Sequence, residues 1–194
     1  SLLLPVTNFN GLASLRDVSV FVVCRWGGSA TAGVLGAWDS AAGNTHFEVQ
    51  SGDVIRMRIG ALDSAAASAR STTGVTANAW CQLAAVMSGA GDAPALNLYR
   101  NGAGYLSYAK EPGAAALSSY AYMALGNSLK SERYFDGDMA EVLIFNRALS
   151  ASERTQVGRY LSACYGLAYP IGAAELHTNF SLDADGETLT LRRP

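Results

Sequence analysis

The chain has 194 residues, of which 49% are apolar and 15% are charged, and its formal net charge is −2. This balance excludes a disordered chain, and no run of lysine or arginine suggests nucleic acid or an anionic membrane as a partner. The apolar stretches are too short for a transmembrane helix, and the length suits one domain with a substantial hydrophobic core.

Short strands separated by turns dominate the chain up to about residue 145. β-branched and aromatic residues predict strands at residues 17–26, 33–38, 46–50, 54–59, 80–87, 96–100, 121–126 and 139–145. The turn at 51–53 should join two of these strands in a hairpin, and Asn101-Gly102 should close another, because both residues tolerate positive φ. We expect 139–145 to be the best core strand and the alanine- and serine-rich segment 61–69 to form a loop.

One amphipathic helix is predicted after the last of these strands. Ser150 suits the N-cap, and Glu153 three residues later completes a capping box. Gly166 suits the C-terminal end. The apolar residues that recur at helical spacing, and should face the sheet, are Val157, Tyr160, Leu161 and Cys164.

The pattern divides the chain into a sandwich domain at residues 1–170 and an extension at 171–194. Two short strands around an acidic turn are predicted within 176–191, and this segment either begins a following module or clamps onto the sandwich edge.

Three cysteines rule out a fully paired intrachain set. Cys24 and Cys81 lie in apolar strand segments, which favours two small buried hydrophobic residues. A disulfide between them is the alternative if their strands adjoin. Cys164 lies in the predicted C-terminal helix and should simply be packed.

The stretch 134–154 reads Tyr-Phe-Asp-Gly-Asp-Met-Ala-Glu-Val-Leu-Ile-Phe-Asn-Arg-Ala-Leu-Ser-Ala-Ser-Glu-Arg. It resembles the last strand and following helix of laminin-G-like domains in the concanavalin A-like lectin/glucanase superfamily. Segments 18–23 and 98–102, together with Trp80, are similar to further marks of that family. The strand pattern and the resemblance together predict an all-β, two-sheet antiparallel jelly-roll sandwich with one C-terminal amphipathic helix. The resemblance also implies binding of glycans or extracellular proteins, in some members with Ca²⁺.

Aromatic rings beside polar groups are the usual means of binding sugars. The candidates for a glycan-binding site are Trp38 and Asp39 at a strand end, with Tyr105 and Tyr108. Trp26, Tyr120 and Tyr122 are weaker candidates, and Trp80 is expected in the core. For any one of these aromatic residues, a core or ordinary surface position is the alternative.

Asp136 and Asp138 are the candidate ligands for Ca²⁺, with a solvated turn as the alternative. The same residues form an Asp136-x-Asp138-x-x-Glu141 pattern. Related sandwich glucanases carry Glu-x-Asp-x-x-Glu, where two carboxylates perform the chemistry. Aspartate at the first position is too short to copy that glutamate, so we do not expect catalysis.

The sequence therefore predicts a non-catalytic module of a larger secreted or cell-surface protein that recognises carbohydrate, with Ca²⁺ as a candidate cofactor. Its predicted partners are a glycan or an extracellular protein and the neighbouring domains. One alternative is a structural or protein-interaction spacer, and another is a glycoside hydrolase of the related sandwich class.

Overall fold

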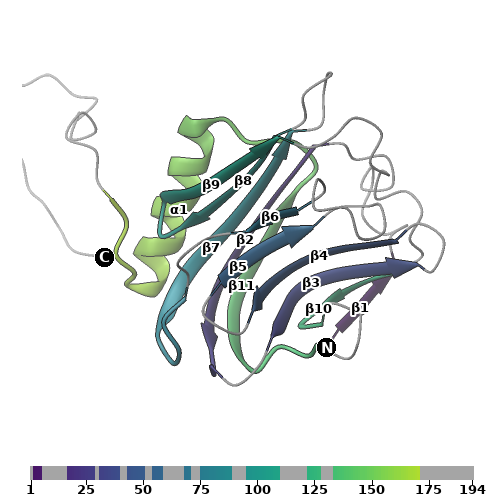
Figure 1. The fold of residues 1–194 in the computed structure, drawn as a ribbon. Coiled ribbons are helices and arrows are strands. Elements are labelled where there is room, and N and C mark those ends of the chain that lie inside the picture. The colour runs from purple at the N-terminus through teal and green to yellow at the C-terminus, as the bar shows by residue number, and fades with distance from the viewer. Residues whose placement is uncertain are drawn as a thin grey trace, which may run out of the picture.

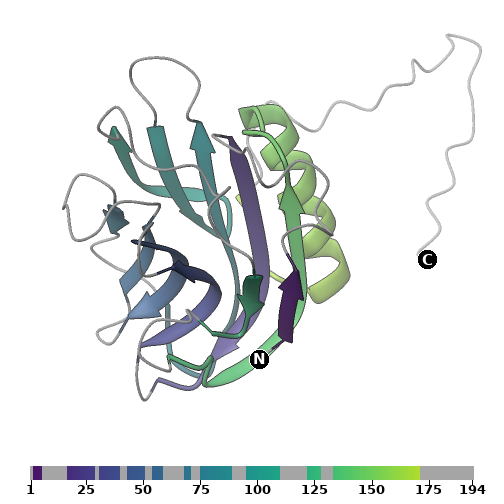
Figure 2. The same ribbon diagram turned by 90° about the vertical axis from the view of Figure 1, so that its right-hand side faces the viewer.

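The structure is a computed structural model that describes residues 2–5, 17–28, 31–39, 43–50, 54–58, 68–70, 75–88, 95–109, 122–127 and 133–170. Two antiparallel sheets pack face to face, and one helix covers the outer face of one of them (Figures 1 and 2). This arrangement confirms the predicted two-sheet sandwich with a single C-terminal helix in the described ranges. The hairpin predicted within 176–191 lies outside them.

Each sheet combines a run of consecutive strands with strands from distant parts of the chain. The six-stranded sheet has the order β1 (Leu2–Pro5), β10 (Tyr122–Leu125), β3 (Ala32–Asp39), β4 (Gly43–Gln50), β5 (Val54–Arg58) and β6 (Ser68–Arg70). The five-stranded sheet has the order β11 (Gly137–Phe145), β2 (Val18–Trp26), β7 (Trp80–Ser88), β8 (Ala95–Arg100) and β9 (Ala103–Ala109). The two predicted hairpins, β4–β5 and β8–β9, are both present. Ser68 and Ala69 belong to a strand, which corrects the end of the loop expected at 61–69; residues 61–67 lie outside the described part.

The main core lies between the sheets and is filled by alternate residues of each strand. From β2 it takes Val18, Val20, Val22, Cys24 and Trp26, and the facing sheet supplies Phe47, Val49 and Ile55. Trp26 is only 1% exposed, so this ring belongs to the core and is not available to stack on a sugar. The burial of Cys24 and Cys81, which are register partners and free thiols, confirms that they act as small buried hydrophobic residues; they form no disulfide here.

Strand β11 was expected to be the best core strand, and this expectation was wrong. It lies at the edge of its sheet, and its residues are at most half-buried, whereas β2 and β7 occupy the centre and are almost entirely buried. An apolar run predicts that a strand is buried, but it does not show whether the strand lies at the centre or at the edge of its sheet. The position is determined by the order of the strands, in which β2 lies between β11 and β7.

Helix α1 (Ala151–Tyr165) begins and ends as predicted. Ser150 and Glu153 form the capping box, and Gly166 ends the helix in the left-handed conformation with φ 64°. Leu161 is fully buried against the outer face of the five-stranded sheet, in a second cluster with Phe21 and Val23. Tyr160 and Cys164, however, are exposed, which corrects the expectation that they face the sheet. Within the described ranges, no helix has the length and apolar character to cross a membrane.

Stability at acid pH should depend on the carboxylate of the capping box. Hydrogen bonds from Arg147, and from the backbone and side chain of Ser150, lower the pKa of Glu153 from 4.5 to about 2. A depressed folded-state pKa stabilises the native state above the unfolded pKa, and this stabilisation is lost as pH falls toward 2. We expect the difference in Tm between the wild type and Glu153→Gln to be constant down to about pH 5 and to shrink between pH 4.5 and 2.

Thermal melts of both proteins, followed by circular dichroism from pH 7 to pH 2, measure this difference directly. The other carboxylates titrate equally in the two proteins, so their effects cancel in the difference in Tm. A difference in Tm that does not change with pH would show that the charge of Glu153 contributes nothing.

Candidate functional site

Three exposed side chains form a row across the five-stranded sheet, on the face that carries the helix. Arg25 on β2 is the register partner of both Trp80 on β7 and Asp138 on β11. Its Nε and Nη2 donate hydrogen bonds to Asp138 Oδ2 at 2.9 and 2.6 Å, and its guanidinium lies 5.5 Å from the centre of the Trp80 ring. The ion pair therefore fixes a guanidinium beside an indole that is 42% exposed.

The prediction that Trp80 lies in the core was wrong, and the period of a strand explains why. Cys81, Leu83 and Ala85 face the core, so Trp80 lies on the opposite face of the sheet, one residue out of phase with them. A short turn delivers the chain to this point: Asn78 has φ 60°, and its N–H donates to the carbonyl of Trp26. The sequence did carry a signal for this position. Trp80 is three residues from Leu83, and in a regular strand residues an odd number apart point to opposite faces of the sheet.

A β-bulge extends the row along β11. The register skips Ala140 between Met139 and Glu141, so Met139 packs into the main core while Glu141 lies on the same face as Asp138. In a regular strand, residues three apart would lie on opposite faces. Glu141 is the register partner of Val23, two residues from Arg25, which places it about 7 Å along the strands from the Arg25 row.

The C-terminal end of α1 supplies two tyrosines to this face. Tyr165 donates a hydrogen bond to Glu141 Oε2 at 2.9 Å, and Tyr160 donates to Oε1 at 3.4 Å. Both rings are exposed, and the Glu141 carboxylate raises the pKa of both phenols, so they remain protonated donors at neutral pH. We refer to this surface as the Trp80 patch; its members are Arg25, Trp80, Asp138, Glu141, Tyr160 and Tyr165.

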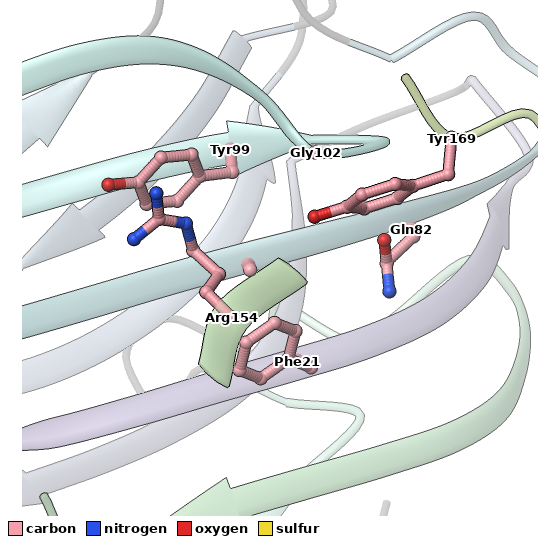
Figure 3. A pocket seen from close by; sticks show the side chains of 7 residues that line it. Phe21, Gln82, Tyr99, Gly102, Arg154 and Tyr169 are labelled. Carbon is pink, nitrogen blue, oxygen red and sulfur yellow. The ribbon is translucent and has the colours of Figure 1, made fainter. Parts of the chain in front are cut away.

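A small hollow lies beside the helix, on the same outer face of the five-stranded sheet (Figure 3). Its empty volume of about 170 Å³ includes open solvent, and the Tyr169 ring, the Arg154 guanidinium and the Tyr99 ring line it. Arg154 stacks 4.1 Å from the centre of the Tyr99 ring. The Tyr169 ring fits against Gly102 and Gly158, where any side chain would collide with it. These contacts hold α1 to the β8–β9 turn, so we assign the hollow a structural role.

The sequence-predicted glycan residues fall on different sheets. Trp38 and Asp39 end β3 in the six-stranded sheet, whereas Tyr105 and Tyr108 belong to β9 in the other sheet. The backbone therefore does not place these four residues in one sheet, and their role stays a prediction.

The aspartates predicted to bind Ca²⁺ lie at the start of β11. Asp138 is ion-paired with Arg25, and the carboxylate of Asp136 lies 2.7 Å from the position that a Cβ on Gly27 would occupy. No three His, Cys, Asp or Glu side chains of the described ranges gather closely enough to hold a metal ion. Calcium binding here stays a prediction.

Comparison with known proteins defines the family. A family model described as the concanavalin A-like lectin/glucanases superfamily, of the laminin G type, matches residues 13–153 and confirms the resemblance seen in the sequence. No curated protein sequence matches the chain significantly.

Solved structures share the fold at low sequence identity. The CBM40 domain of the Ruminococcus gnavus IT-sialidase, bound to α2,3-sialyllactose, has a TM-score of 0.63 and 13% identity, over 76% of this chain and 85% of that one. A native heptameric SAP-like pentraxin from Limulus polyphemus has a TM-score of 0.57 and 15% identity, over 75% of this chain and 70% of that one. The NanB sialidase of Streptococcus pneumoniae has a TM-score of 0.60 and 15% identity, over 80% of this chain and 26% of that one. At such identities these similarities establish the fold.

Proposed function

Because this chain belongs to the concanavalin A-like lectin/glucanases superfamily, we propose that it is a non-catalytic carbohydrate-binding module whose sugar site is the Trp80 patch. The observation that carries the proposal is the exposed Trp80 ring held beside the Arg25–Asp138 ion pair. The apolar C–H face of a sugar stacks on an aromatic ring, and its hydroxyls exchange hydrogen bonds with fixed charged groups. The CBM40 domain bound to sialyllactose gives a precedent for sugar binding on this fold.

The contacts of the carboxylates support a non-catalytic role. A retaining glycosidase needs two facing carboxyl groups about 5 Å apart, one of them free to act as acid and base. Here Asp138 is held by Arg25, and Glu141 accepts hydrogen bonds from Tyr160 and Tyr165. Both carboxylates thus take part in fixing side chains of the binding surface. We propose that the module acts outside the cell, as part of a larger secreted or surface protein.

Replacing Trp80 by alanine is expected to weaken glycan binding at least about tenfold, because truncating an aromatic anchor at the centre of a binding surface removes most of its contact energy. The first measurement is a glycan array with the wild-type protein, followed by titration calorimetry on the best glycan. Trp80→Phe, which keeps a ring, should retain part of the affinity.

Tyr134→Ala is the matched control, because Tyr134 is also exposed, at 54% against 42% for Trp80, but it pairs with Asn127 and is not one of the patch residues. Binding lost in Trp38→Ala but unchanged in Trp80→Ala would move the site to the end of β3. All titrations are run with CaCl₂ and with a chelator, which tests the prediction for Asp136 and Asp138. Absence of binding to any glycan would overturn the proposal in favour of a spacer or protein-docking role.

A further inference from the structure

The charges around the Trp80 patch are predominantly negative. Asp138 and Glu141 provide two carboxylates of the patch, while Arg25 provides one guanidinium, so these three groups carry a formal net charge of −1. The guanidinium is already neutralised, since two of its nitrogens bind the same oxygen of Asp138. A second acidic group that approached Arg25 would compete with Asp138 at 2.6 Å and would meet Glu141 about 7 Å away.

The hydrogen-bonding groups of the patch suit sugar hydroxyls. Ionised carboxylates are pure acceptors, and every sugar hydroxyl has a proton to donate. The patch residues hold one another in place: Arg25 fixes Asp138, and Tyr160 and Tyr165 fix Glu141 from the helix. Acceptors oriented in this way bind a hydroxyl without first reorganising, which lowers the cost of association.

We infer that the Trp80 patch selects uncharged glycans and discriminates against sialylated or sulfated ones, a specificity that rests on the proposed function. The indole stacks on the sugar ring, the carboxylates accept from its hydroxyls, and the excess negative charge repels an acidic substituent. This preference differs from that suggested by the CBM40 domain bound to sialyllactose, whose fold this chain shares but whose sequence is only 13% identical.

The test uses an array of neutral glycans, each printed beside its sialylated and its sulfated counterpart, probed with the full chain at low ionic strength. We expect each acidic member to bind roughly three- to tenfold more weakly than its neutral partner, as expected for one like-charge contact near the surface in water. Raising the ionic strength to about 0.5 M should narrow that gap, because the Debye length falls below the separation of the charges.

Asp138→Asn is the decisive variant, because it removes one carboxylate and releases the charge of Arg25 while keeping the shape of the side chain. It should raise the affinity for acidic members relative to neutral ones at least about threefold. Glu153→Gln makes the same change of charge near the start of α1, about 18 Å along the helix from Tyr165 and about 10 Å from Tyr160, and should change the ratio much less. Melting curves confirm that both variants are folded.

The outcomes separate the two proposals. Wild-type protein that binds acidic and neutral members equally, or prefers the acidic ones, overturns the inference while the module remains a glycan binder. If Asp138→Asn discriminates against acidic glycans as strongly as the wild type, the inference is also overturned, because the charges of Arg25 and Asp138 would then not cause the discrimination. Loss of all binding to neutral and acidic members alike would overturn the proposed function itself.

Discussion

Replacing Gly137 by alanine is expected to lower the free energy of unfolding by about 3 kcal/mol or more. Gly137 has φ 139°, a conformation that residues with a side chain rarely adopt. A Cβ at this position would collide with the carbonyl oxygen of Arg25 and would lie 3.1 Å from the Cα of Trp26. Both atoms belong to the backbone of β2, so no flexible side chain is available to move aside.

The cost combines two physical terms. Forcing a methyl group against backbone costs about 1–3 kcal/mol, and holding alanine at this φ costs a similar amount. β2 cannot shift to make room, because Trp26 is buried in the main core and is the register partner of Gly137. For a domain of this size we expect Tm to fall by about 10 °C.

Gly104→Ala is the matched control for this experiment. Gly104 also lies in a strand, but a Cβ there would meet only Tyr99, at an ordinary distance of 3.6 Å. The free energy of unfolding of Gly104→Ala should differ from that of the wild type by less than about 1 kcal/mol, as measured by urea unfolding followed by tryptophan fluorescence. Equal destabilisation in both variants would show that the close approach of β11 to β2 is not what requires glycine at position 137.

Replacing Arg133 by methionine is expected to cost about 3 kcal/mol of stability. Arg133 Nη1 donates to both carboxylate oxygens of Glu48, at 3.2 and 3.1 Å, and Glu48 is 0% exposed. Removing this guanidinium takes an ion-pair partner away from a fully buried carboxylate, and the loss of that compensation is strongly destabilising.

Local geometry holds this ion pair together. Glu48 on β4 is the register partner of Gly33 on β3, which has no side chain to fill the space between them. The N–H of Gly33 donates to the carbonyl of Arg133 at 3.0 Å, so the segment before β11 is fixed beside β3. The pair thus connects the segment that leads into β11 with the six-stranded sheet.

A double-mutant cycle with Glu48→Gln tests the electrostatic origin of the effect. Arg133→Met combined with Glu48→Gln should be more stable than Arg133→Met alone, because the buried charge is gone. Arg147→Met is the exposed comparison, since its pair with Glu153 is 53% and 38% exposed and should contribute much less to stability than the buried pair. If Arg133→Met costs no more than Arg147→Met in urea unfolding, the buried pair does not stabilise the fold.

Local sequence was sufficient to predict where the helix begins and ends and where the chain turns between β8 and β9. The capping box at Ser150 and Glu153, the left-handed Gly166 and the Asn101-Gly102 turn are all present as predicted. Each is decided by the conformational preference and hydrogen bonding of a few adjacent residues, which the sequence states directly. The apolar and β-branched runs likewise identified β2 to β5, β7, β8, β10 and β11 and, with the motif at 134–154, the family.

The position of each strand in its sheet and the face of each side chain were decided only by the tertiary structure. Ala140 is the extra residue of the bulge in β11, and nothing in its identity marks it; yet it brings Asp138 and Glu141 to one face. That face becomes a candidate site because α1 returns over the same sheet and brings Tyr160 and Tyr165 to Glu141. A period-two pattern assigns alternation along one strand, but bulges shift its phase and long-range packing decides which face stays exposed.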